Sequence, residues 1–246
     1  MATPTQRSAF AAALIVSIGL GGQINTLSAQ ENPAPPHRKG ILFEDRFERS
    51  ELGMQYEVVN PDPNRFAMTG NKLLLVASKP VKNFVLLNKI LPGDFVATVQ
   101  VTMQVAAGNF TSLYYYIDEN NFLSTGITAA DNCHAVPWGN IDCSWSNRRQ
   151  PYFSKVVGGE TNNIAMRIPS LASRSLDGYA EKEEPWYFQL RREGIKYTAQ
   201  ISVDGVRWTD LGTHVVIPKH GRLGIKAGSR GGVENAAEFG ELVVQE

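Results

Sequence analysis

The stretch that decides the fold is Phe95-Val96-Ala97-Thr98-Val99-Gln100-Val101-Thr102-Met103. Its odd-numbered residues are all apolar, whereas Thr98, Gln100 and Thr102 stand between them. Successive side chains of a β-strand point to opposite faces, so this pattern predicts a strand with one side against a core and the other in water. A helix would scatter both sets of residues around its axis.

The same alternation recurs in 196–203, where Tyr197, Ala199, Ile201 and Val203 are the apolar set. Asp204-Gly205 follows it and predicts a tight type I′ hairpin. Gly, Pro, Asn and Asp separate further strand candidates, which are 41–47, 56–60, 65–69, 73–77, 84–88, 112–117, 122–128, 163–168, 185–193, 206–209, 222–228 and 236–244. No stretch has helical spacing, so the sequence predicts an all-β sandwich or barrel.

Composition narrows the class of protein. The chain has 246 residues, 43% hydrophobic and 20% charged, which is enough for an extensive core. Lys+Arg and Asp+Glu both number 24, so no bulk charge attracts nucleic acid and we expect none to bind. The 2 cysteines and 4 histidines are too few for a zinc ribbon or an iron–sulfur cluster held by four thiolates.

The N-terminal residues have the pattern of a signal peptide over 1–29. Arg7 is the only charged residue there, 8–22 is apolar and small, and Leu27-Ser28-Ala29 offers a cleavage site. A membrane anchor is the alternative, but the apolar run is short of the ~20 residues that span a bilayer. We therefore expect a secreted or periplasmic protein with no membrane insertion of the mature chain, a Pro-rich tether over 30–40 and one domain over 41–246.

Two segments carry a resemblance to a known family. The first is Phe43-Glu44-Asp45-Arg46-Phe47, and the second is Trp186-Tyr187-Phe188-Gln189-Leu190-Arg191-Arg192-Glu193-Gly194, continuing through 201–212. Both resemble concanavalin A-like jelly-roll domains, found at the C-terminus of family 43 glycosidases and in related bacterial proteins of unknown function. The resemblance implies a two-sheet antiparallel jelly-roll sandwich over about 41–244, and it leaves 131–160 unmatched. A fold shared by lectins, glycosidases and adhesion modules does not select among them.

The predicted export to an oxidising compartment bears on the two cysteines of the chain. Cys133 and Cys143 flank nine residues, and in an exported protein they predict a disulfide. So short a loop adds on the order of 2–3 kcal/mol of stability. A metal site with His134 and Asp142 is the alternative.

Candidate sugar-binding residues lie between Asp131 and Phe153 and, as a second group, in strand 112–117. Flat aromatic faces pack against pyranose rings while polar groups bind the hydroxyls. In the alternative interpretation, these rings cap an open end of the sandwich or cover the two tyrosines of strand 112–117. The candidate carbohydrate-binding residues are Trp138, Trp145, Tyr114, Tyr116, Arg148 and Tyr152.

Signals for catalysis are weak. The Glu-x-Asp-x-Glu strand of laminarinase-type jelly rolls is absent, and so is a Gly-x-Ser-x-Gly turn. Glu238 and Glu241 are three apart and would face opposite sides of a regular strand. The sequence predicts no catalytic residues.

The resemblance also implies a structural calcium near the first and last strands. Asp45 shares a strand face with Phe43 and Phe47, where a lone carboxylate is unfavourable. A hydrogen-bonded or salt-bridged Asp45 is the alternative. Gly240 stands where such domains often have Asp, which weakens the calcium site.

Together these observations predict a secreted, monomeric, non-catalytic jelly roll that binds a glycan or polysaccharide. A carbohydrate-active hydrolase, with carboxylates that only the fold brings together, is the second hypothesis. A structural or adhesion module with a protein partner is the third.

Overall fold

The computed structural model describes residues 40–91, 93–103, 108–129, 134–135, 141–142, 149–165, 185–217, 220–230 and 234–246. The predicted signal peptide and nearly all of the tether lie outside these residues. The described elements are η1 (Pro63–Arg65), a 3₁₀ turn, and the strands β1 (Ile41–Asp45), β2 (Tyr56–Val59), β3 (Phe66–Met68), β4 (Leu73–Ala77), β5 (Phe84–Ile90), β6 (Phe95–Met103), β7 (Asn109–Asp118), β8 (Asn121–Ala129), β9 (His134–Ala135), β10 (Ile141–Asp142), β11 (Arg149–Val157), β12 (Glu160–Ala165), β13 (Pro185–Glu193), β14 (Lys196–Ser202), β15 (Thr209–Val215), β16 (Arg222–Ser229) and β17 (Asn235–Gln245).

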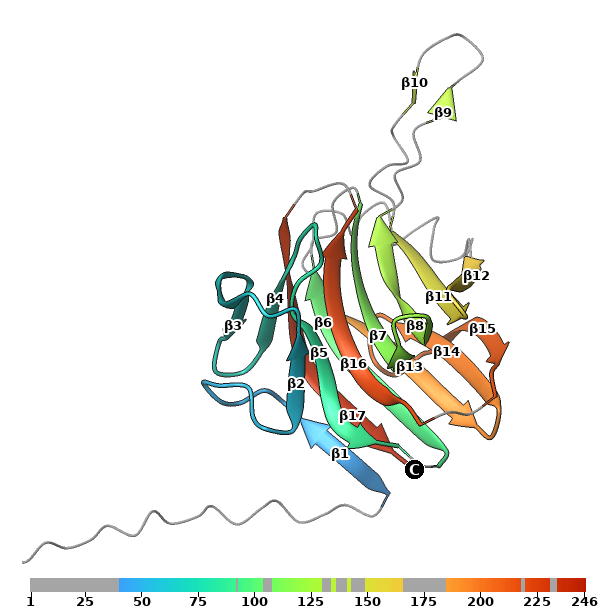
Figure 1. The fold of residues 1–246 in the computed structure, drawn as a ribbon, viewed down its shortest axis with the longest axis horizontal. Coiled ribbons are helices and arrows are strands. Elements are labelled where there is room, and N and C mark those ends of the chain that lie inside the picture. The colour runs from blue at the N-terminus through green and yellow to red at the C-terminus, as the bar shows by residue number, and fades with distance from the viewer. Residues whose placement is uncertain are drawn as a thin grey trace, which may run out of the picture. The chain divides into compact units, whose positions relative to one another are not determined.

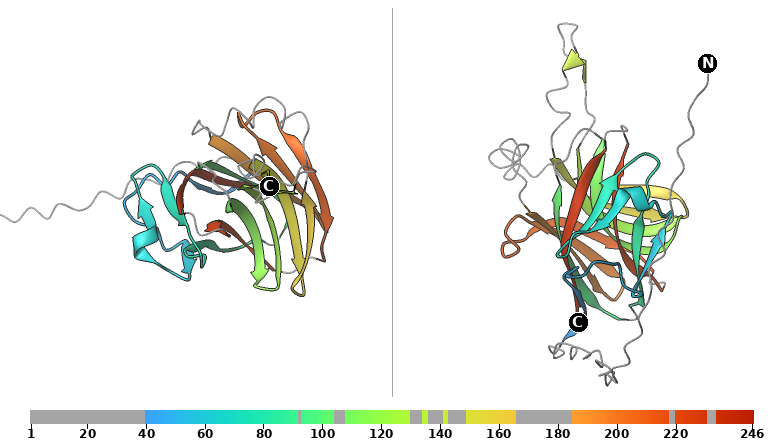
Figure 2. Two further views of the ribbon diagram at one scale, coloured as in Figure 1. Left: turned by 90° about the horizontal axis from the view of Figure 1, so that it is seen from above. Right: turned by 90° about the vertical axis from the view of Figure 1, so that its left-hand side faces the viewer.

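The strands form two antiparallel sheets that face each other, as Figures 1 and 2 show. The eight-stranded sheet has the order β15-β14-β13-β6-β17-β4-β3, with β1 paired to β17. The seven-stranded sheet has the order β12-β11-β8-β7-β16-β5-β2, and β9 and β10 pair separately. The predicted two-sheet antiparallel sandwich is therefore confirmed.

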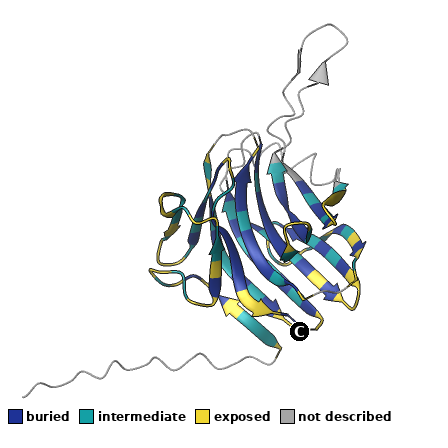
Figure 3. Cartoon of the chain, in the orientation of Figure 1, coloured by how far each residue is buried: buried dark blue, intermediate teal, exposed yellow. Residues whose placement is uncertain are grey.

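The core lies between the two sheets and follows the period of two. Every odd-numbered residue of β6 is buried, and Figure 3 shows such buried bands along the strands of both sheets. Phe188 and Leu190 on β13 lie beside Val99 and Ala97 of β6 in the antiparallel register. Burying each large side chain of this kind contributes roughly 1.5–3 kcal/mol.

The outer face of the eight-stranded sheet is polar, as expected for a face in water. Its side chains bond across neighbouring strands: Gln189 Nε2 donates to Thr98 Oγ1 over 3.2 Å, and Gln100 Nε2 donates to the Tyr187 hydroxyl over 3.0 Å. This face matches the predicted polar positions of β6 and β14.

Several local predictions were wrong, among them the strand over 206–209, of which only Thr209 lies in a strand. Strand β11 was not predicted, and the connection after β14 is a six-residue loop over 203–208 rather than a two-residue hairpin. Asp204 shapes that loop, because its carboxylate accepts the N–H groups of Val206 and Arg207 at 2.9 and 2.8 Å. In β17 the register shifts between Phe239 and Glu241. An extra residue at such a bulge reverses the alternation after it.

The bulge overturns the expectation that Glu238 and Glu241 face opposite sides. Phe239 and Leu242 are buried on the core side, so both glutamates lie on the outer face of the eight-stranded sheet. Glu238 forms an ion pair with Lys72, and Glu241 forms one with Arg46. Among the described residues, no helix has the length and hydropathy to cross a bilayer.

Candidate functional site

The outer face of the seven-stranded sheet is aromatic where a face in water is usually polar. Phe84 and Leu86 from β5 and Tyr114 from β7 form a hydrophobic cluster there, separate from the main core. The Phe84 ring centroid lies 5.0 Å from that of Tyr114 and 5.1 Å from that of Tyr116, and Tyr114 lies 5.5 Å from Phe122. An apolar layer on the outside of a sandwich needs an explanation other than core formation.

Glycines on the central strand β16 make room for these rings. A Cβ atom at Gly224 would lie 2.6 Å from both Phe84 and Leu86, and one at Gly228 would lie 2.4 Å from Phe110. Those distances are far below van der Waals contact, so only a residue without a side chain fits under each ring. The rings therefore lie across the surface of β16.

A pocket of about 330 Å³ opens on this face over β7, β8, β11 and β12. Aromatic rings and hydroxyl groups both line it. The lining residues are Phe110, Tyr114, Phe122, Ser124, Thr128, Tyr152, Ser154, Val156, Thr161, Asn163 and Arg230. We call this the sheet-face pocket.

Hydroxyl groups are concentrated beneath the sheet-face pocket. The hydroxyls of Tyr152 and Ser112 form a hydrogen bond, and those of Tyr114 and Ser124 belong to the same network. Burial raises the pKa of both tyrosines, so their phenols stay protonated in the ordinary pH range. A neutral hydroxyl can both donate and accept a hydrogen bond, as a sugar hydroxyl also does.

Three of the predicted carbohydrate-binding residues lie on this one face. Tyr114 and Tyr152 line the sheet-face pocket, and Tyr116 packs edge-on against Phe84. The sequence placed Tyr152 in an inserted loop with the tryptophans, but it lies in β11, where Gly126 of β8 is its partner. Tyr114 is 7% exposed, so it forms the floor of the pocket.

The other predicted residues of this segment are not described by the structure. Trp138, Trp145, Arg148, Cys133 and Cys143 lie outside the described residues. Backbone pairing of His134 with Asp142 is described, and the two cysteines directly flank this pair in the sequence. The disulfide and the role of the tryptophans stay predictions.

Asp45 does not fit a calcium site. Both of its carboxylate oxygens accept hydrogen bonds from Arg49, and the Tyr56 hydroxyl donates a further one. A cation would have to displace the guanidinium of Arg49 from this carboxylate. No group of three or more His, Cys, Asp or Glu residues suited to a metal ion occurs in the described part of the chain.

Sequence reasoning missed Lys226, which lies beside the sheet-face pocket. Its Nζ atom is 5.2 Å from the ring centroid of Phe84 and 5.4 Å from that of Tyr114. Burial lowers the pKa of this ammonium group. The sequence did contain a sign of this position. In 222–230 the residues alternate, so Lys226 shares a strand face with Gly224 and Gly228.

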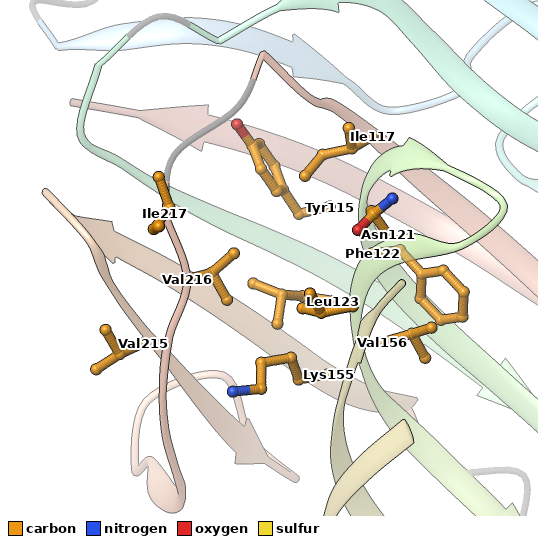
Figure 4. Close-up of a pocket in the computed structure, with 11 residues that line it drawn as sticks. Tyr115, Ile117, Asn121, Phe122, Leu123, Lys155, Val156, Val215, Val216 and Ile217 are labelled. Carbon is orange, nitrogen blue, oxygen red and sulfur yellow. The ribbon is translucent and has the colours of Figure 1, made fainter. Parts of the chain in front are cut away.

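A second pocket, also of about 330 Å³, has a different character (Figure 4). Val215, Val216 and Ile217 form one side of it, and Leu123 and Val156 belong to the seven-stranded sheet opposite. Its lining is mostly aliphatic and offers few groups that could bind sugar hydroxyls. The sheet-face pocket is therefore the better candidate site.

Comparisons with solved structures agree with the fold. The GH43 protein BlXynB from Bacillus licheniformis is similar with a TM-score of 0.64 at 15% identity, over 82% of this chain and 39% of that one. A xylan β-1,4-xylosidase from Bacillus halodurans gives 0.63 at 14%, over 88% and 41%. A β-glucanase from Bacillus licheniformis gives 0.55 at 11%, over 85% and 100%.

These likenesses confirm the predicted resemblance to jelly-roll domains of family 43 proteins and glucanases, and at such identities they show the fold alone. The chain spans about two fifths of the length of the family 43 proteins that it resembles. No family model and no curated protein matches the sequence.

Proposed function

We propose that the protein is an exported carbohydrate-binding module and that the sheet-face pocket holds part of a polysaccharide. The observation that carries this proposal is the difference between the two outer faces of the sandwich. One is an ordinary polar face, whereas the other carries an aromatic cluster in which Tyr114 and Phe122 also line a pocket that contains hydroxyl groups. The similarity in fold to glycosidases and a glucanase is consistent with a carbohydrate ligand.

The lining of the pocket has the two chemistries that sugar binding needs. Phe110, Phe122 and the tyrosines offer apolar surface for the C–H face of a pyranose ring. Thr161 and Asn163 of the edge strand β12 are exposed and offer donors and acceptors for sugar hydroxyls.

Binding without hydrolysis is favoured by the side chains that are present. Glycoside hydrolysis uses a pair of carboxylates, roughly 5–9.5 Å apart, on either side of the scissile bond. None of the described residues that line the sheet-face pocket is Asp, Glu or His. The proposed role is therefore attachment to a glycan rather than its cleavage.

Retention of the mature protein on immobilised polysaccharides, together with a glycan array, tests this function. Asn163→Ala removes a polar group that lines the pocket, and we expect it to weaken binding about fivefold, the value of one hydrogen bond. Asn162→Ala is the matched control, since Asn162 is exposed on the same strand but does not line the pocket.

An equal loss of retention in the Asn163→Ala and Asn162→Ala variants would contradict the assignment of binding to the sheet-face pocket. Failure of the wild-type protein to bind any glycan would contradict the function itself. The Trp138→Ala and Trp145→Ala variants belong in the same experiment, because they test whether the 131–153 segment contributes to binding.

A further inference from the structure

Strand β16 carries a regular row of cations along the aromatic face. Its core side presents Leu223, Ile225 and Ala227, all buried. Its other side presents in turn Arg222, Gly224, Lys226 and Gly228, and Arg230 follows directly and lines the sheet-face pocket. We call Arg222, Lys226 and Arg230 the cationic row.

Among the described residues, an acidic side chain pairs with only one end of this row. Arg222 forms an ion pair with Glu57 of β2. Neither Lys226 nor Arg230 forms an ion pair with any residue in the described part of the chain. The protein as a whole has equal numbers of acidic and basic residues, so this excess of positive charge is local.

Lys226 is held in place by aromatic rings rather than by a carboxylate. Phe84 of β5 and Tyr114 of β7 flank its ammonium group, and Ser112 is its register partner on β7. Burial lowers its pKa, and no carboxylate among the described residues offsets that effect by raising it. A partly buried cation without an anionic partner is costly unless a ligand supplies the anion.

We propose that the cationic row selects an acidic polysaccharide, one whose carboxylate or sulfate groups bind to Lys226 and Arg230. This inference rests on the proposed function and names the class of glycan. Four residues of a strand extend roughly 13 Å, so the Cα atoms of Lys226 and Arg230 lie about that far apart along the aromatic face. A polymer with repeated charges can reach both while its rings lie on the aromatic face.

Two pairs of polymers separate charge from backbone. Polygalacturonate and its fully methyl-esterified form share one backbone, and carboxymethyl cellulose and hydroxyethyl cellulose share another. We expect retention on the charged member of at least one pair and at least tenfold weaker retention on its neutral counterpart. We also expect that retention to fall as salt rises to 1 M, where the screening length drops to about 3 Å.

Variants locate the interaction on the sheet. We expect Lys226→Gln and Arg230→Gln each to weaken retention on the charged polymer about fivefold. Lys196→Gln and Arg191→Gln are the matched controls, because both residues are exposed on the eight-stranded sheet. Lys226→Met keeps the apolar stem of the side chain and replaces the glutamine variant if that variant fails to fold, as judged by its melting temperature.

The outcomes distinguish this inference from the proposed function. Equal retention on charged and neutral polymers, or unchanged retention by the Lys226 and Arg230 variants, would overturn the inference and leave carbohydrate binding intact. Equal retention on single-stranded DNA would show a general polyanion surface and would also overturn it. Absence of binding to every polymer would overturn both.

Discussion

Asp45 is a buried carboxylate whose charge is compensated by neighbouring hydrogen-bond donors. Its side chain is 4% exposed. Burial by itself would raise the pKa of this carboxyl, but hydrogen bonds from Arg49, the Phe47 N–H and the Tyr56 hydroxyl outweigh it and hold the pKa below its usual value of 3.8. The sequence left a choice between calcium and a salt bridge, and the contacts favour the salt bridge.

We expect Asp45→Asn to lower the free energy of unfolding by about 2 kcal/mol at neutral pH, because it leaves the guanidinium of Arg49 without its anion. The folded pKa lies below the unfolded one, so the carboxylate stabilises the fold above about pH 4 and this contribution is lost as pH falls through the folded pKa. Urea denaturation across pH 2–7 measures both effects, and the difference between wild type and variant should shrink at the acidic end.

Glu44→Gln is the control, since Glu44 pairs with Arg46 on the exposed surface and its substitution should change the free energy of unfolding by less than about 1 kcal/mol.

Calcium removal provides a second check on Asp45. We expect a chelator to leave the melting temperature unchanged. A clear fall on chelation would show that a bound metal stabilises the native state after all.

At the scale of single elements, the packing of β7, β8 and β11 builds the floor of the sheet-face pocket. Gly126 of β8 lies between Ser112 of β7 and Tyr152 of β11 in the register. A Cβ atom there would lie 2.0 Å from the carbonyl oxygen of Thr111. Backbone atoms in a hydrogen-bonded strand cannot move aside as a flexible side chain can.

We expect Gly126→Ala to destabilise the protein by about 2–3 kcal/mol, because the added methyl group forces the two strands apart. Gly93→Ala is the matched control, since a Cβ atom at Gly93 would meet nothing within 4 Å. Thermal or chemical unfolding of both variants provides the measurement. Similar stability of the two would contradict the close approach of β7 and β8 at this position.

At the scale of the whole molecule, non-local pairing closes the sandwich. The first strand β1 pairs with the last strand β17, and β6 joins β13 and β17, which lie far from it in sequence. Such pairing places the two ends of the domain beside each other, and the seven-stranded sheet carries a hydrophobic cluster on its outer face in addition to the core on its inner face. Two further predictions concern the whole chain: its export and the disulfide between its two cysteines.

We expect the mature protein from an exporting host to begin at Gln30 and to contain a Cys133–Cys143 disulfide. Its intact mass should correspond to residues 30–246 less two hydrogens, and neither cysteine should react with an alkylating reagent before reduction. The small loop that the bond closes should add about 2–3 kcal/mol to stability. Retention of residues 1–29, or alkylation of both cysteines in the native protein, would contradict these predictions.

Local patterns in the sequence determined the fold class, because the period of two in β6 and β14 records which side chains face the core. They also placed Tyr114 and Tyr116 among the candidate carbohydrate-binding residues. Patterns failed where the alternation is interrupted. Strand β11 was missed because Pro151 and Lys155 interrupt the apolar residues on its core-facing side. In β17 the bulge shifts the alternation by one residue, and a count of residues along the sequence does not reveal such a shift.

Only the tertiary structure decided which strands lie side by side, and with that the site. Tyr114, Tyr152 and Lys226 come from β7, β11 and β16, and their separation in sequence gives no sign that they meet. Strand pairing across long loops brings them together on one sheet face, because register is fixed by burying the opposite side of each strand in the core.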